Sequence, residues 1–214
     1  MTEQDFLVKR KLMVARQLMG GGISDRCVLE AFASIPRHLF IPAEYREFAY
    51  EDRPLLIGFE QTISQPYIVA YMTQSLALAG AERVLEVGTG SGYQAAILSR
   101  LVAEVHTVEL IPALAERARE TLDGLGITNV QVHIGDGSLG WDASAPYDAI
   151  LVTAAGPRVP KSLLNQLADG GRMILPVGEP GFQNLELWHR EGDSFTNEIL
   201  LSVAFVPLRG REGV

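Results

Sequence analysis

A glycine-rich turn, Gly88-Thr89-Gly90-Ser91-Gly92, is the strongest chemical signal in the sequence. It follows the short apolar run 83–87 and opens a second apolar stretch of helical character. Glycine lets a backbone turn tightly and come close to a bound molecule at the end of a strand. We therefore predict that this turn binds a cofactor where a buried strand passes into a helix.

The spacing of the glycines distinguishes two kinds of cofactor. A dinucleotide-binding turn places its third glycine three residues after the second, and Tyr93 stands at that position. The alternate spacing found here is the form seen in enzymes that use S-adenosylmethionine. We therefore expect S-adenosyl-L-methionine as the cofactor, with S-adenosyl-L-homocysteine as its product.

Acidic residues near successive strand ends support this prediction. Glu109 ends the second predicted strand, where a carboxylate can accept hydrogen bonds from both ribose hydroxyls. Asp136 and Gly137 follow the third strand and suit contact with an adenine edge, and Glu86 is a candidate partner for the cationic end of the methionine moiety. Taken alone, Glu109 is more often a solvated charge at a strand end and Asp136 more often a turn residue, and Glu86 could equally be a strand residue with a structural partner. Their order on successive strands favours a cofactor site.

The elements that must position these residues alternate along the chain. Short apolar runs predict strands at 83–87, 104–108, 130–133, 147–153, 172–176, 184–189 and 199–206. Helices are predicted at 5–19, from Ser24-Asp25 to before Pro36, from near Pro66, at 92–101, from Pro112, and at 163–167. The stretch 37–66 predicts loops with short strands. This pattern predicts a doubly wound α/β fold, with a mostly parallel central sheet and helices on both faces.

Composition limits the classes of function. The 214 residues include 18 Lys and Arg against 26 Asp and Glu, and the net charge of −8 argues against a nucleic-acid partner, which is bound through basic side chains. A single cysteine, Cys27, cannot form an internal disulfide, which suits a reducing cytosol. There is no signal-peptide core and no apolar run of the roughly 20 residues that a membrane helix needs. We expect a cytoplasmic protein with no membrane partner.

Several separated motifs between about residues 17 and 208 belong together. They are PRHLFIP at 36–42, AYEDRPLLIGFEQTISQPYIVAYM at 49–72, VLEVGTGSGYQAA at 84–96, GDGSLGW at 135–141, PYDAILVTAA at 146–155, QLADGGRMILPVG at 166–178 and FVPL at 205–208. In this combination the chain resembles the protein-L-isoaspartate O-methyltransferases, a family that repairs damaged aspartyl residues. The glycine turn is shared with many methyltransferases, whereas GFEQTISQPY is close to diagnostic.

The resemblance implies an enzyme that moves a methyl group from S-adenosylmethionine to the α-carboxylate of L-isoaspartyl residues in damaged proteins and peptides. It implies the Rossmann-like fold of class I S-adenosylmethionine-dependent methyltransferases, as one domain over 1–214. Within that domain we expect a helical, substrate-side region at 1–80, a cofactor-binding core at 81–180 and C-terminal strands at 181–214.

The resemblance also implies roles for residues of the QTIS segment. Ser64 corresponds to the family's active-site serine, and its neighbours Gln61, Thr62 and Ile63 are expected to line the donor and acceptor clefts. Tyr67 falls where family members contact the cofactor, and the FVPL segment is expected to close over the peptide. A plain alternative for Ser64 is that it caps the helix that starts near Pro66.

The chemistry agrees with so sparse a site. A carboxylate acceptor is already ionised at pH 7 and needs no general base. The sequence offers none, since its four histidines, His38, His106, His133 and His189, have no paired spacing, and no metal-binding motif is present. We expect catalysis by alignment, with the Ser64 hydroxyl donating a hydrogen bond that orients the acceptor.

Two other functions stay open at this point. One is a methyltransferase of the same fold that acts on RNA or a small molecule; the acidic charge and the QTISQPY stretch disfavour it, as does Thr153-Ala154-Ala155-Gly156 in place of an N/D-P-P-Y/F motif. The other is a module that binds the cofactor but has lost catalysis, which the intact Ser64 and glycine turn disfavour. The sequence leaves the oligomeric state and the role of residues 1–16 open.

Overall fold

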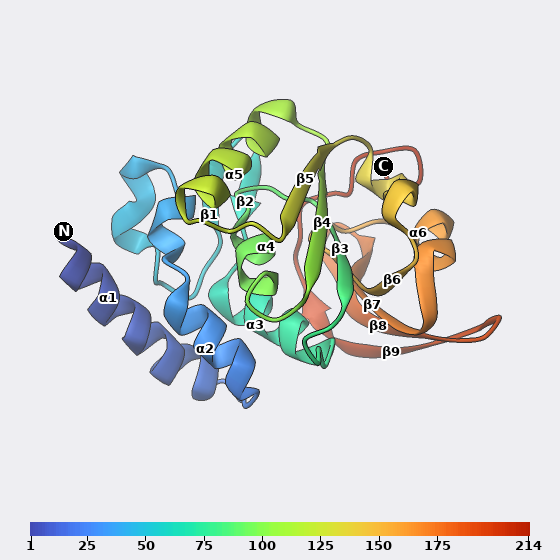
Figure 1. Ribbon diagram of the computed structural model, residues 1–214, viewed down its shortest axis with the longest axis horizontal. Helices are drawn as coiled ribbons and strands as arrows, with labels where there is room; N and C mark the ends of the chain where they lie inside the picture. The colour runs from blue at the N-terminus through green and yellow to red at the C-terminus, as the bar shows by residue number, and fades with distance from the viewer.

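A seven-stranded sheet forms the centre of the computed structural model, which describes all residues, 1–214 (Figure 1). Five strands are parallel: β3 (Arg83–Val87), β4 (Glu104–Glu109), β5 (Val130–Ile134), β6 (Tyr147–Val152) and β7 (Leu167–Glu179). The hairpin of β8 (Phe182–Glu191) and β9 (Ser194–Val203) extends the sheet with antiparallel pairing. The order across the sheet is β5-β4-β3-β6-β7-β8-β9.

The chain reverses its direction across the sheet at β3. It proceeds from β3 through β4 to β5 on one side, and then returns to add β6 and β7 on the other. In open α/β sheets a ligand binds at such a switch point, outside the carboxyl ends of the strands. The glycine turn begins at this point, directly after Val87.

Helices cover both faces of the sheet (Figure 1). The helices α3 (Pro66–Ser75), α4 (Tyr93–Leu98) and α5 (Pro112–Gly124) lie on one face, and α6 (Lys161–Gln166) lies on the other. Pro66 and Pro112 occupy the first helical position, where a missing N–H costs nothing. The apolar stripe of α5 is buried in full; its members are Leu114, Ala115, Ala118 and Leu122.

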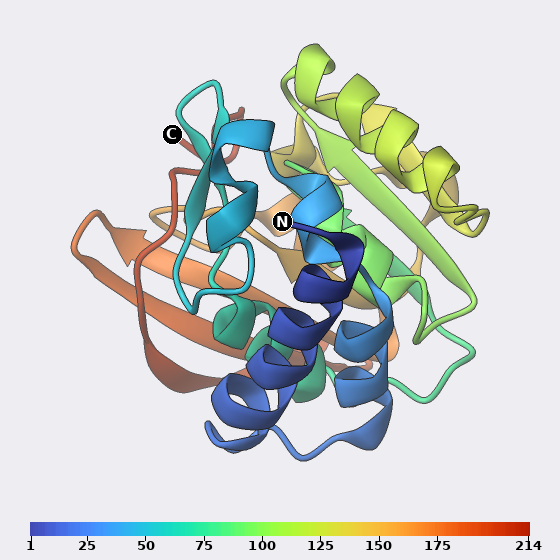
Figure 2. The same cartoon turned by 90° about the vertical axis from the view of Figure 1, so that its left-hand side faces the viewer.

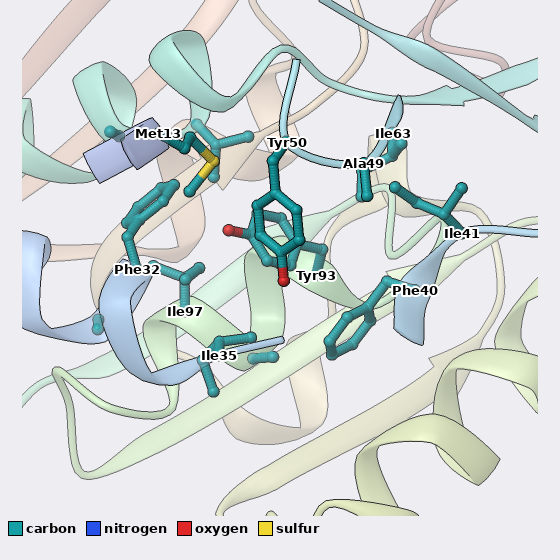
Figure 3. Packing of buried hydrophobic residues seen from close by; sticks show 14 of the residues in the cluster. Met13, Phe32, Ile35, Phe40, Ile41, Ala49, Tyr50, Ile63, Tyr93 and Ile97 are labelled. Atoms are coloured by element: carbon teal, nitrogen blue, oxygen red, sulfur yellow. The ribbon is translucent and has the colours of Figure 1, made fainter. Parts of the chain in front are cut away.

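An N-terminal layer packs outside α3 and α4 (Figure 2). The first helix is α1 (Glu3–Leu12), which continues as a π-helix over Met13–Met19. Next comes α2 (Arg26–Ser34), where Asp25 caps the helix by accepting a hydrogen bond from the Val28 amide. Apolar side chains of this layer gather around Tyr93, the first residue of α4 (Figure 3). The chain then forms two short 3₁₀ helices (Arg37–Phe40 and Ala43–Phe48) and the hairpin of β1 (Leu55–Gly58) and β2 (Gln61–Ile63).

The structure confirms the predicted fold class and corrects several boundaries. The strand predicted at 199–206 is wrong in its last three residues, because β9 spans 194–203 and the chain then turns back toward Ala155. There the Ala155 amide donates to the Val206 carbonyl and the Leu208 amide donates to the Ala155 carbonyl. The helix predicted at 163–167 spans 161–166, the helix predicted at 92–101 ends at Leu98, and two 3₁₀ helices stand where only loops and strands were expected. No helix combines the length and the apolar character needed to span a bilayer.

Candidate active site

The glycine turn has the backbone conformation that its sequence predicts. Gly88, Gly90 and Gly92 all have positive φ, at 92°, 53° and 87°, a region that other residues rarely adopt. A Cβ at Gly88 would collide with the Thr153 hydroxyl, which donates a hydrogen bond of 2.7 Å to the Gly88 carbonyl. The turn therefore requires glycine for its backbone conformation, and at Gly88 also for the close contact with Thr153.

The Glu109 carboxylate connects the turn to the end of β4. One oxygen accepts a hydrogen bond from the Gly90 amide at 2.8 Å, and the other accepts from the Ile111 amide at 2.9 Å. The side chain is buried, with 6% of its surface exposed. Each carboxylate oxygen has a second lone pair, so Glu109 can hold the turn and still accept ribose hydroxyls.

Glu86 is an acidic residue that is fully buried and has no partner within the protein. It lies on β3, two residues before Gly88, is fully buried, and neither carboxylate oxygen has a hydrogen-bond partner. Burial without a counter-ion raises the pKa of Glu86 to about 8. A buried carboxylate is costly unless paired, so this position calls for a cation from outside the chain.

Two cavities meet at Gly88 and together run across the carboxyl ends of the central strands. The first is lined by Glu86, the glycine turn and the QTIS segment; its lining includes Thr62, Ile63, Ser64, Glu86, Thr89, Gly90, Ser91 and Thr153. The second is lined by Gln61, Glu109, Gly137 and the segment Pro207–Arg209. An elongated cofactor with a cationic amino acid at one end and a nucleoside at the other matches this pair of cavities.

Ser64 lies between the first cavity and a third, larger cleft. This cleft has a volume of about 450 Å³ and is lined by Pro54, Gln65, Ile68 and the segment Ser202–Val206. Three residues line both spaces: Thr62, Ser64 and Thr153. The structure thus places the predicted catalytic serine at the boundary between the cavity beside the glycine turn and this larger cleft.

Three predicted site residues, Gly92, Tyr67 and Asp136, line none of these cavities. Tyr67 is in the first turn of α3, where its ring packs on Tyr71 and its amide donates to Asp52. Asp136 uses both carboxylate oxygens within the protein, one toward Ser138 and one toward the Arg211 amide at 2.8 Å. Its neighbour Gly137 does line the second cavity.

Sequence reasoning missed Thr153. It follows β6, the strand beside β3, and the rule that ligands bind at the carboxyl ends of such strands was a usable signal. Two histidines that the sequence does not pair are brought together by the fold, away from the site. His106 on β4 and His133 on β5 stack their rings, with 3.0 Å between Nδ1 of His106 and Nε2 of His133. Burial lowers the pKa of both, to about 4 for His133, and neither lines the cavities described above.

The sheet order and the glycine turn at its switch point define a class I S-adenosylmethionine-dependent methyltransferase. The family model for protein-L-isoaspartate(D-aspartate) O-methyltransferase matches residues 9–213. The chain belongs to this family.

Known proteins agree with that assignment. The chain is 55% identical over 207 residues to protein-L-isoaspartate O-methyltransferase 2 of Pelobacter propionicus, covering 96% of this chain and 92% of the relative. It is 52% identical over 205 residues to the protein-L-isoaspartate O-methyltransferase of Methanoregula boonei, covering 96% and 94%. A solved protein-L-isoaspartate O-methyltransferase superposes with a TM-score of 0.86 at 32% identity, over 95% of this chain and 67% of that one.

A second solved structure bears on the fold. A putative protein-L-isoaspartate O-methyltransferase from Plasmodium falciparum, in complex with S-adenosyl-L-homocysteine, superposes with a TM-score of 0.82 over 94% of this chain and 98% of that one. Its sequence identity is 24%, so the likeness concerns the arrangement of the chain.

Proposed function

We propose that this protein transfers the methyl group of S-adenosylmethionine to the α-carboxylate of L-isoaspartyl residues in damaged proteins and peptides. The observation that carries the proposal is the position of Ser64 between the cofactor cavity and the 450 Å³ cleft, on a chain of this family. The cleft has room for part of a peptide, and the family to which the chain belongs indicates that the acceptor is an isoaspartyl carboxylate.

The residues of the two smaller cavities fit the cofactor. Glu86 offers a buried, unpartnered carboxylate to the α-ammonium group, and Glu109 offers acceptor lone pairs to the ribose. Gly88 and Gly90, in the turn between them, have no side chain to obstruct a ligand lying across it. When bound, S-adenosylmethionine supplies a methyl group on a positively charged sulfur.

The protein's own residues have little proton chemistry to perform. An isoaspartyl α-carboxylate is ionised at neutral pH and attacks without a base. The Ser64 hydroxyl donates a hydrogen bond to the acceptor and fixes its direction, while Thr62 and Thr153 complete the polar wall between the two spaces. The apolar residues Val203 and Phe205 reduce water in the cleft, which favours a step in which opposite charges are neutralised.

The test is methyl transfer from labelled S-adenosylmethionine to a peptide that contains L-isoaspartate, with its normal aspartyl twin as control. A methyl ester hydrolyses in mild base, so labelled methanol released from the isoaspartyl peptide alone supports the proposal. Transfer to neither peptide, with cofactor binding verified by calorimetry, contradicts it.

A further inference from the structure

Arg37 is the largest fully buried side chain in the protein, and it has no carboxylate partner. It belongs to the first 3₁₀ helix, far from the glycine turn in sequence. Its Nε donates a hydrogen bond of 2.8 Å to the Ala49 carbonyl, and its Nη2 donates one of 2.8 Å to the carbonyl of Ser64. The remaining nitrogen, Nη1, is buried with no acceptor.

The guanidinium also contacts the helix that follows the glycine turn. Its central carbon lies 4.9 Å from the ring centroid of Tyr93, and Tyr93 itself lines the cofactor cavity beside Ser64. Figure 3 shows Tyr93 in the middle of the apolar cluster formed by the N-terminal layer. Arg37 therefore contacts both the segment that bears the serine and the helix of the cofactor side.

A buried arginine without a counter-ion is not explained by a need to stabilise the fold. Desolvation lowers the pKa of Arg37 to about 10, so the side chain still carries its charge at neutral pH. Well-packed apolar residues usually stabilise a core as well as, or better than, buried charged groups do. What an arginine adds is a rigid fork of donors, which can hold two carbonyls at fixed positions.

The Ser64 segment is held from its other side as well. Asp52 accepts hydrogen bonds from the Gln65 side chain at 2.9 Å and from the Tyr67 amide at 3.1 Å. Asp52 is exposed, whereas Arg37 is fully buried. The four residues from Ser64 to Tyr67 are therefore fixed between a guanidinium inside the protein and a carboxylate at its surface.

We propose that Arg37 is a positioning residue for methyl transfer, which sets the place of the Ser64 hydroxyl through its hydrogen bond to the Ser64 carbonyl and its contact with Tyr93. The inference rests on the proposed function, in which Ser64 orients the acceptor carboxylate. Arg37 itself lines none of the three cavities. A displacement of Ser64 by about 1 Å is enough to lower turnover by up to about 100-fold.

The test compares Arg37→Lys and Arg37→Met with the native enzyme on the isoaspartyl peptide. A lysine ammonium cannot span both carbonyls, so we expect kcat per cofactor-binding site to fall about 10- to 100-fold. The Kd for S-adenosyl-L-homocysteine should stay within about threefold, because the hydrogen bonds that join Glu109 to the Gly90 and Ile111 amides do not involve Arg37. Arg172→Lys is the matched control, since Arg172 also donates to a backbone carbonyl, that of Ala77.

A double-mutant cycle with Ser64→Ala separates positioning from general destabilisation. If Arg37 acts through the serine, Arg37→Lys should lower kcat much less in the Ser64→Ala background than in the native one. Equal losses in both backgrounds, or kcat per binding site within twofold of native in Arg37→Lys, would overturn the inference. Absence of turnover by the native enzyme would instead overturn the proposed function.

A second variant covers a failure of these proteins to fold. Arg37→Gly, refolded with millimolar guanidinium or with ammonium as control, should bind cofactor and regain turnover with guanidinium only. Cofactor-binding protein that turns over equally well with ammonium, or with no added cation, would contradict the role of the donor fork.

Discussion

Glu86→Gln is the substitution whose effect the structure defines best. The carboxyl is fully buried without a hydrogen-bond partner, and its pKa is about 8 against an ordinary value of 4.5. In the folded, cofactor-free protein Glu86 is therefore protonated at neutral pH, whereas in the unfolded chain it is ionised. Folding takes up a proton here, so the contribution of Glu86 to stability is fully present below pH 4.5 and is lost as pH rises to about 8.

The size of this effect follows from the two pKa values. Between them, the free energy of unfolding falls by about 1.4 kcal/mol for each pH unit on account of this one group. Between about pH 5.5 and about pH 8 the native protein should thus lose about 3 kcal/mol that the neutral glutamine does not lose. The stability of Glu86→Gln relative to the native protein should therefore rise by about 3 kcal/mol over that range.

The assay is urea unfolding of the cofactor-free proteins at several pH values, followed by the fluorescence of Trp141 and Trp188. Only the difference between Glu86→Gln and native protein is interpreted, because other groups titrate in both. The control is Glu120→Gln, which replaces an exposed glutamate that forms no ion pair. Its unfolding free energy shows the effect of removing a solvent-exposed carboxylate. The reasoning is refuted if the difference in unfolding free energy between Glu86→Gln and native protein is constant across this pH range.

Cofactor binding should show the opposite dependence at the same residue. A bound ammonium group stabilises the ionised form of Glu86, so below about pH 8 binding should release a proton and become tighter as pH rises. Calorimetry of S-adenosyl-L-homocysteine in buffers of different ionisation enthalpy measures that proton, which Glu86→Gln should not release.

Four further predictions concern the rest of the site. Ser64→Ala should lower kcat on the isoaspartyl peptide while the Kd for S-adenosyl-L-homocysteine changes little; full turnover would exclude the proposed role. Glu109→Ala should weaken cofactor binding by about 1.5–3 kcal/mol in calorimetry, the range for hydrogen bonds to a charged group. Gly88→Ala should lower the melting temperature and abolish cofactor binding, since the backbone at this position has φ of +92° and the new methyl would meet the Thr153 hydroxyl. Glu212→Ala should weaken cofactor binding slightly, because the Glu212 carboxylate accepts two hydrogen bonds from Ser162 in α6 and so holds the C-terminal segment, in which Pro207–Arg209 line the second cavity; an unchanged Kd would show that these bonds are irrelevant to the site.

The sequence alone determined the features that depend on neighbours along the chain. Apolar periodicity predicted the parallel strands, prolines marked the starts of α3 and α5, and the alternate glycines predicted a tight turn after β3, whose positive φ values the structure confirms. These signals are local, because they reflect backbone conformation and the burial of one face of an element. The family assignment also came from linear motifs and agrees with the known relatives.

The tertiary structure decided which distant residues meet. Nothing near Arg37 in the sequence indicates that it bonds to Ser64, and nothing near Asp136 indicates that the C-terminal segment occupies its carboxylate. The end of β9 differs from its predicted position for the same reason. The backbone of Ala155 bonds to Val206 and Leu208, so residues 204–208 leave the edge of the sheet. Burial, which leaves Glu86 without a partner, is a property of the assembled molecule, and so is the raised pKa that follows from it.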